Sequence, residues 1–192
     1  MKNILVCVVL LFAGVASAKN YIAFVNVGGA VGESEFSRAV TNDLMGVIYV
    51  DARIECAKGI DIPTLIGTAS QGYPKGDRQL AVYFVDSPDF PPQVTVPGFF
   101  AIVNMRGLKK DADAKKYSSR VAKMVMKGLA FACGFGANQD IGRCVMSAGS
   151  FDTLKGIDAT SASYSPFVYF PLSDYLQKRD LLAIIPEEPE EQ

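Results

Sequence analysis

One segment of the chain, residues 121–133, constrains the fold more than any other. Two lysines and one glycine alone interrupt its apolar residues, so a helix formed here has no broad polar face and is buried on most sides. Gly134 and Gly136 follow, and glycine readily takes the positive φ angle at which many helices end. The sequence therefore predicts a central, buried helix that ends where these glycines begin.

Strand-like and helix-like segments alternate along the rest of the chain. Runs of β-branched and aromatic residues predict strands, and apolar residues four apart, as at Phe36 and Val40, predict helices that lie on a sheet. Asp111 or Asp113 is expected to cap the central helix, and Ser150 a later one. The expected strands are 21–27, 47–55, 80–85 and 98–105, and the other expected helices are 33–45, 62–71, 150–156 and 172–182.

This alternation indicates an α/β domain with a mainly parallel sheet. We expect one layered domain over residues 19–184, with a mixed, mostly parallel sheet of about four strands packed on helices. Its length fits a single domain of ~100–200 residues. Three prolines predict an irregular segment at 86–92. The tail 185–192 is expected to be disordered, because its Glu- and Pro-rich sequence has little apolar surface to bury.

Residues 1–18 have the three-part form of a secretory signal peptide. Lys2 precedes an apolar run at residues 4–13, and Ala16-Ser17-Ala18 offers small residues for cleavage. The run is shorter than the ~20 apolar residues of a transmembrane helix. We therefore expect an exported protein, periplasmic or secreted, that begins near Lys19 and has no membrane association after cleavage. The alternative is that the signal stays uncleaved and tethers the protein to the membrane.

The charges of the chain are nearly balanced. Its 19 basic and 20 acidic side chains give a formal net charge of −1, and loss of Lys2 with the signal peptide makes the charge one unit more negative. Such a balance gives no electrostatic reason to bind nucleic acid or an anionic membrane. We therefore expect no nucleic-acid partner.

Three cysteines remain after signal cleavage: Cys56, Cys133 and Cys144. Two states are compatible with this odd number in an oxidising compartment: one disulfide plus one remaining thiol, or three buried thiols. A bond between Cys133 and Cys144 would join the end of the central helix to the following loop. Three thiols without histidine make a poor structural zinc site.

The segment 120–146 resembles the archaemetzincins, a branch of the metzincin zinc peptidases. Their core motif is H-E-x-x-H-x-x-G-x-x-H, followed by a cysteine pair and a methionine. When Gly134 is taken as the glycine of the motif, Cys144 and Met146 match its final Cys-x-Met. The first cysteine of the pair falls on Asn138, and the loop is one residue longer than usual. The resemblance implies a metzincin-like layered domain.

The same alignment places other residues at every position that the family uses for chemistry. The three zinc-ligand histidines fall on Lys127, Phe131 and Ala137, the general-base glutamate falls on Gly128, and the whole chain contains no histidine. Zinc hydrolysis needs three protein ligands, an open position for water and a base. We therefore expect no catalytic residues, no metal and no cofactor at these degenerate active-site positions.

Lys127 and Phe131 are four residues apart and so share one face of the helix. We consider two conformations for the lysine. Its ammonium lies along the Phe131 ring, in the space of the missing metal, or its side chain extends from the helix edge into solvent.

Two functions remain open at the level of sequence. The first is an exported, noncatalytic pseudopeptidase that binds a peptide, a protein or a glycan. The second is an enzyme, either a divergent hydrolase or a metallopeptidase with an unrecognised site. A cysteine hydrolase lacks its usual histidine base, and a Ser-Lys pair that includes Lys127 has no specific sequence signal.

Two further motifs are better interpreted as turns. The glycines of segment 28–32 follow a strand but lack the first glycine of a dinucleotide-binding loop. Asp86 and Asp89 offer a pair of carboxylates for calcium or acid–base chemistry, although aspartates beside Ser-Pro more often stabilise turns. The aromatic residues between 164 and 175 are expected to close the core.

Overall fold

The structure, a computed structural model, describes residues 19–44, 48–57, 64–67, 76–137, 143–149 and 151–183. The predicted signal peptide, Asn138, Ser150 and the acidic tail lie outside these residues. The elements in chain order are β1 (Tyr21–Val27), α1 (Glu33–Arg38), η1 (Ala39–Asp43), β2 (Ala52–Ala57), β3 (Arg78–Val85), β4 (Gln93–Val96), β5 (Phe100–Asn104), α3 (Ala114–Ala132), α4 (Leu154–Ala159) and α5 (Pro166–Lys178).

The strands form one mixed sheet with the order β2-β1-β3-β5-β4. Four strands are parallel to one another, and the edge strand β4 is antiparallel to β5, with Val94 opposite Ile102. The expected α/β fold with a mostly parallel sheet is confirmed, but the sheet has five strands and not four. Strand β4 was not predicted because it is short, follows the prolines and is half exposed.

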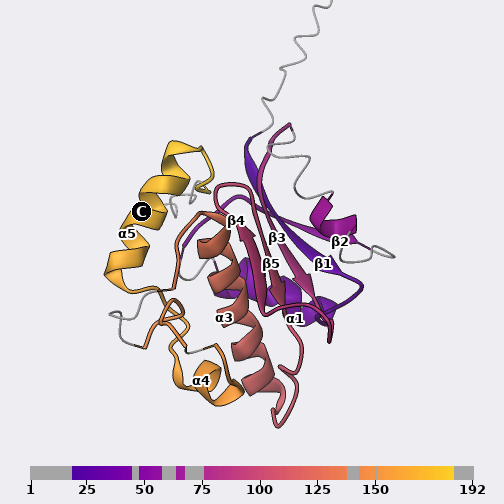
Figure 1. The fold of residues 1–192 in the computed structure, drawn as a ribbon. Coiled ribbons are helices and arrows are strands. Elements are labelled where there is room, and N and C mark those ends of the chain that lie inside the picture. Colours follow the sequence, from indigo (N-terminus) through magenta and orange to yellow (C-terminus); the bar gives the residue numbers. More distant parts are fainter. Residues whose placement is uncertain are drawn as a thin grey trace, which may run out of the picture.

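Helix α3 lies across one face of the sheet, in contact with β3, β4 and β5 (Figure 1). Alternate residues of the strands point to this face, as the two-residue period of a strand requires. Ile22, Phe24 and Val82 pack there with α3, while Ala23 and Val25 belong to a second apolar cluster. The predicted central helix is therefore confirmed, buried from Arg120 to its end.

Both ends of α3 are satisfied by local hydrogen bonds. Asp113 is the N-cap, and its carboxylate accepts from the backbone N–H of Lys116 at 2.7 Å. Gly134, at φ +93°, follows the helix. Its N–H donates to Phe131 and the next N–H donates to Ala130, the paired bonds of a Schellman motif. Of the two predicted capping glycines, Gly134 has this role.

Gly128 lets α3 approach the sheet closely. A Cβ atom at this position would lie 2.6 Å from Cγ1 of Val82 and 3.0 Å from Cγ2 of Val103. Real Cβ atoms do not come so close to their neighbours, so a larger residue here requires the helix to move away from β3 and β5.

Several predicted bounds are wrong. The helix expected at 33–45 is α1 followed by the π-helical segment η1, and β2 begins at Ala52 rather than at residue 47. The helix expected at 150–156 begins at Leu154, with Thr153 as its N-cap. Helix α5 begins at Pro166, six residues before its predicted start.

Candidate functional site

Three of the predicted site positions line one cavity. Lys127 and Phe131 extend from α3, and Ala137 follows the helix on the chain that leaves it. The cavity has a volume of about 310 Å³, and Met124 and Phe151 also form its walls. The structure thus brings together the three residues to which the sequence resemblance assigns the metal-ligand positions of the archaemetzincin motif, an assignment that stays a prediction.

The other predicted positions do not line this cavity. The missing side chain of Gly128 faces the sheet, and a Cβ at Gly134 would meet Pro97 at 3.3 Å. Met146 is fully buried in the main core. The assignment of these residues to positions of the peptidase motif stays a prediction.

Lys127 lies between two aromatic rings. Its Nζ is 3.8 Å from the centre of the Phe151 ring and 5.4 Å from that of Phe131. The residue is only 8% exposed. The conformation alongside Phe131 is therefore the one found, and the solvent-extended alternative is wrong. Phe151 was not anticipated, because it comes from a segment with no sequence relationship to α3.

Burial changes the acidity of this ammonium group. Desolvation lowers the pKa of Lys127 to about 8, and the negative charge of Asp152 partly offsets this effect. Asp152 is exposed at the border of the cavity. The site thus holds a lysine that is mostly protonated near neutral pH and titrates within a mildly alkaline range.

Two other cations on α3 are also buried, and both have oxygen partners. Arg120 donates to the carboxylate of Asp158 at 2.7 and 2.8 Å and to the carbonyl of Leu108 at 2.6 Å. Lys123 donates to the carbonyl oxygen of Ile157 at 3.0 Å. Ile157 and Asp158 both belong to α4, so their bonds to Lys123 and Arg120 attach α4 to the central helix.

The arginine pair is the stronger of the two attachments. The guanidinium of Arg120 holds the pKa of Asp158 well below its usual range, and the carboxylate raises the pKa of Arg120 in return. Lys116 adds a second ion pair to Asp158, with its Nζ 3.1 Å from the carboxylate. Sequence reasoning missed this group, since no local spacing relates Arg120 to α4.

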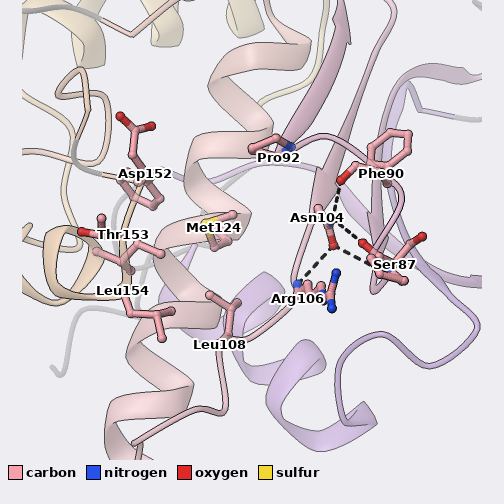
Figure 2. Close-up of a pocket in the computed structure, with 13 residues that line it drawn as sticks. Ser87, Phe90, Pro92, Asn104, Arg106, Leu108, Met124, Asp152, Thr153 and Leu154 are labelled. Carbon is pink, nitrogen blue, oxygen red and sulfur yellow. Dashed lines mark hydrogen bonds between the residues drawn. The ribbon is translucent and has the colours of Figure 1, made fainter.

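A second cavity, also of about 310 Å³, adjoins the first (Figure 2). Met124, Phe151 and Asp152 line both cavities. Figure 2 shows Met124 on α3 between Asp152 on one side and Asn104 on the other. We call these two adjoining cavities, which share lining residues, the groove.

Asn104 shapes the far wall of the second cavity. Its side-chain amide donates to the carbonyl oxygens of Ser87 and Phe90 at 2.8 and 2.9 Å, and its Oδ1 accepts from the N–H of Arg106 at 3.2 Å. These bonds fix the proline-containing loop after β3 against the end of β5. The wall is therefore built from ordered backbone.

The residues at the family's metal position do not fit a zinc ion. Among Lys127, Phe131 and Ala137, only the lysine has a nitrogen, and a methyl or phenyl group has no lone pair to donate. Across the described ranges, no three or more His, Cys, Asp or Glu side chains gather as a metal-binding group. These three side chains therefore do not form a ligand set for zinc.

The cysteines lie away from this cavity. Cys56, Cys133 and Cys144 are all present as thiols, so the structure has no Cys133–Cys144 disulfide. Cys133 and Cys144 are buried, as expected, but Cys56 is exposed. Burial raises the pKa of the Cys133 thiol, which makes it a poor nucleophile.

The remaining candidate motifs form turns. Gly28 and Gly29, with φ of +63° and +74°, make the tight turn that follows β1. Asp86 and Asp89 are exposed in the loop after β3. Helices within the described segments lack the combination of length and hydropathy needed to cross a membrane.

The fold of the chain is similar to that of known solved structures. No protein-family model and no curated protein matches the chain. Among solved structures, archaemetzincin from Methanopyrus kandleri superimposes with a TM-score of 0.62 at 21% identity, covering 83% of this chain and 96% of that one. Archaemetzincin from Archaeoglobus fulgidus, complexed with malonate, gives 0.55 at 13% identity, covering 77% and 97%. The chain has an archaemetzincin-like fold, as its sequence resemblance indicated.

Proposed function

We propose that this chain is an exported, noncatalytic binding protein with an archaemetzincin-like fold. The observation that carries the proposal is the position of Lys127. Its ammonium group, held between two phenyl rings, occupies the cavity where the family motif requires metal ligands. The cavity then serves to bind a peptide, protein or glycan ligand instead of a metal and its water.

The absence of a usable base supports a noncatalytic role. The general-base position of the motif is Gly128, where even a Cβ atom would be 2.6 Å from Val82. A glutamate at this position requires the valine side chains or α3 itself to shift. The lack of histidine in the sequence likewise removes the usual base for a cysteine or serine nucleophile.

The groove supports the binding role. The cavity around Lys127 has mostly apolar walls with a few polar groups, the composition of many ligand sites. Met124 and Phe151 also line the second cavity, whose walls are about equally polar and apolar. The Archaeoglobus protein of the same fold was crystallised with malonate. The export part of the proposal rests on the signal-like sequence of residues 1–18.

Metal analysis and a peptidase assay test the noncatalytic role. Protein purified without chelator is expected to contain no stoichiometric zinc and to cleave no member of a broad peptide library, with or without added zinc. EDTA-sensitive cleavage would replace the proposal with a metallopeptidase. Metal-independent cleavage would replace it with a divergent hydrolase.

Export is tested separately. Expression of the full chain with its own N-terminus, followed by cell fractionation and N-terminal sequencing, is expected to give a processed protein outside the cytoplasm that begins near Lys19. An unprocessed cytoplasmic protein would contradict export and leave the binding role to the other experiments.

A further inference from the structure

The three buried cations of α3 differ in one respect. Arg120 and Lys123 direct their N–H groups at carboxylate or carbonyl oxygens. Within the described part of the chain, Lys127 Nζ forms no hydrogen bond or ion pair, and its near neighbours are the rings of Phe131 and Phe151. Lys127 as a residue is more than nine-tenths buried, and its ammonium group, on the side chain that lines the cavity, has all three of its donors available.

The two aromatic rings stabilise the charge of this ammonium group but give its N–H donors no oxygen acceptors. A ring face attracts a cation, but it does not replace the oxygen acceptors that an ammonium group has in water. Lys127 lines the cavity, so an acceptor for its donors can arrive from that side. The geometry points to a ligand that carries the missing oxygens.

The surroundings indicate which ligand fits. Met124, Phe131 and Phe151 give the cavity apolar walls, and Lys127 is its buried cation. Asp152, the acidic residue of the lining, lies at the exposed border. A ligand that carries an anionic group beside an apolar group complements this arrangement, whereas the positive charge of Lys127 would repel a cationic ligand.

We propose that this cavity binds the carboxylate of a peptide through Lys127, with an adjoining apolar side chain against Met124 and Phe151. The inference rests on the proposed binding function and names its ligand chemistry. A charge-assisted hydrogen bond joins the ammonium to the carboxylate. The volume of about 310 Å³ lies at the small end of ligand sites and suits one residue of the peptide, and the adjoining cavity receives the next.

Methionine NMR provides a direct test, because Met124 lines both cavities. Protein labelled with 13C at its methionine methyl groups is titrated with N-acetyl-leucine and, separately, with N-acetyl-leucinamide. The acid is expected to shift the Met124 signal in a saturable manner. The amide is expected to bind about tenfold or more weakly, the loss typical of one hydrogen bond to a charged group. Met126 and Met146, which are buried outside the cavities, are internal controls.

Two lysine substitutions assign the effect to one residue. Lys127→Met keeps the size of the side chain and removes its charge, so the preference for the acid over the amide should disappear. Lys123→Met removes a buried lysine from the same helix outside the cavity. Its partner, the Ile157 carbonyl, still accepts from the Thr160 hydroxyl at 2.8 Å, so this variant should remain folded and keep the preference.

Further probes distinguish the source of the carboxylate. A short peptide with a free C-terminus and no acidic side chain is compared with an amidated peptide that has one internal glutamate. Binding of the first identifies a terminal carboxylate, and binding of the second identifies an acidic side chain; each supports the proposal. Asp152→Asn should strengthen the binding of either peptide, because it removes a negative charge that competes with the ligand for Lys127.

Several outcomes would overturn the proposal. These are equal binding of acid and amide, an acid preference that survives Lys127→Met, and binding of glucuronate without binding of either peptide. They leave the noncatalytic function intact as long as the protein contains no zinc and cleaves no peptide. Zinc-dependent cleavage would instead remove the proposed function and this inference together.

Discussion

Lys127 Nζ lies 3.8 Å from the centre of the Phe151 ring. Phe151 precedes α4, and the second ring near the same nitrogen, Phe131, belongs to α3 itself. A ring face attracts a cation, which counteracts the desolvation that favours the neutral amine. The charge of Lys127 therefore depends on the packing of a distant segment against the central helix.

Substitution of Phe151 should change the acidity of Lys127. Phe151→Leu retains an apolar side chain but removes the ring face, and we expect the pKa of Lys127 to fall from about 8 by a further unit or so, roughly the value of a partly buried cation–π contact. Titration of the lysine signals by 15N NMR measures this shift. Lys123, which bonds to a carbonyl oxygen, is the control. An unchanged pKa for Lys127 would show that the ring contributes only packing.

The pKa of Lys127 also predicts how stability depends on pH. The pKa is about 8 in the folded protein against 10.5 as the ordinary value, so between these pH values the unfolded chain binds more protons. The free energy of unfolding contributed by this group therefore rises with pH from about 8 and levels off above about 10.5. The full effect is on the order of 3 kcal/mol.

Urea unfolding of wild type and Lys127→Met at several pH values isolates this effect. Burial shifts other groups too, including Cys133 and Tyr164, and both variants share those contributions. Wild type should gain stability from the titration of Lys127 as the pH rises from 7 to 10, and Lys127→Met should not. The free energy of unfolding of Lys127→Met relative to wild type is therefore expected to fall over this range. A constant difference between the two proteins would contradict the low pKa.

The parts of the fold that the sequence predicted well depend on local pattern. Strands β1 and β3 are long apolar runs, and α3 has both a nearly continuous apolar surface and separate start and stop signals at Asp113 and Gly134. Strand β4 is short and half exposed, so its formation depends on pairing with β5. A local pattern contains no information about that pairing.

In the site, too, contacts between residues close in sequence were predictable, and contacts with distant segments were not. The spacing of Lys127 and Phe131 on one helix indicated their contact, because residues four apart share a helix face. The contributions of Phe151 and Asp152 depend on where a distant loop packs. The predicted start of α5, residue 172, is too late, because Pro166 lies in the first turn of the helix, where proline is favoured.

Removal of the Asp158 carboxylate should destabilise the protein strongly. Arg120 is 1% exposed and has this carboxylate as its counterion, so Asp158→Ala leaves a buried guanidinium that has carbonyl acceptors but no counterion. We expect a loss of about 3–5 kcal/mol. The matched control is Asp174→Ala, which breaks the exposed pair with Lys178 and should cost no more than about 0.5 kcal/mol. Chemical denaturation measures both values, and similar losses would show that the Arg120 pair is not a structural attachment.

A methyl group at Gly128 should also be poorly tolerated. Gly128→Ala places a Cβ against Val82 and Val103, and overpacking of this kind costs about 1–3 kcal/mol. Gly136→Ala is the control, because a Cβ there meets nothing within 4 Å, and its effect should stay within about 0.5 kcal/mol. The denaturant midpoints of unfolding of the two variants measure this difference in stability. Equal midpoints would mean that α3 can shift away from the sheet at little cost.

The last prediction concerns the three positions at which the family motif has histidines. Lys127, Phe131 and Ala137 line one cavity, so the triple variant Lys127→His, Phe131→His, Ala137→His should place three imidazoles around a common point. Three such ligands suffice for an open zinc site. We expect zinc to bind about 100-fold or more tightly than to the wild type, a difference of about 2.7 kcal/mol, as measured by competition with a chromophoric chelator.

The matched control is the double variant that retains Ala137, since two histidines on one helix face already bind zinc weakly. Affinity equal to that of the double variant would show that residue 137 does not face the other two. Peptide hydrolysis is not expected from the triple variant, because the base position is Gly128 and the sheet leaves no room for a side chain there. Zinc binding without hydrolysis would therefore separate two features of this site, the lack of metal ligands and the lack of a base, and would attribute the second to the close contact of α3 with β3 and β5.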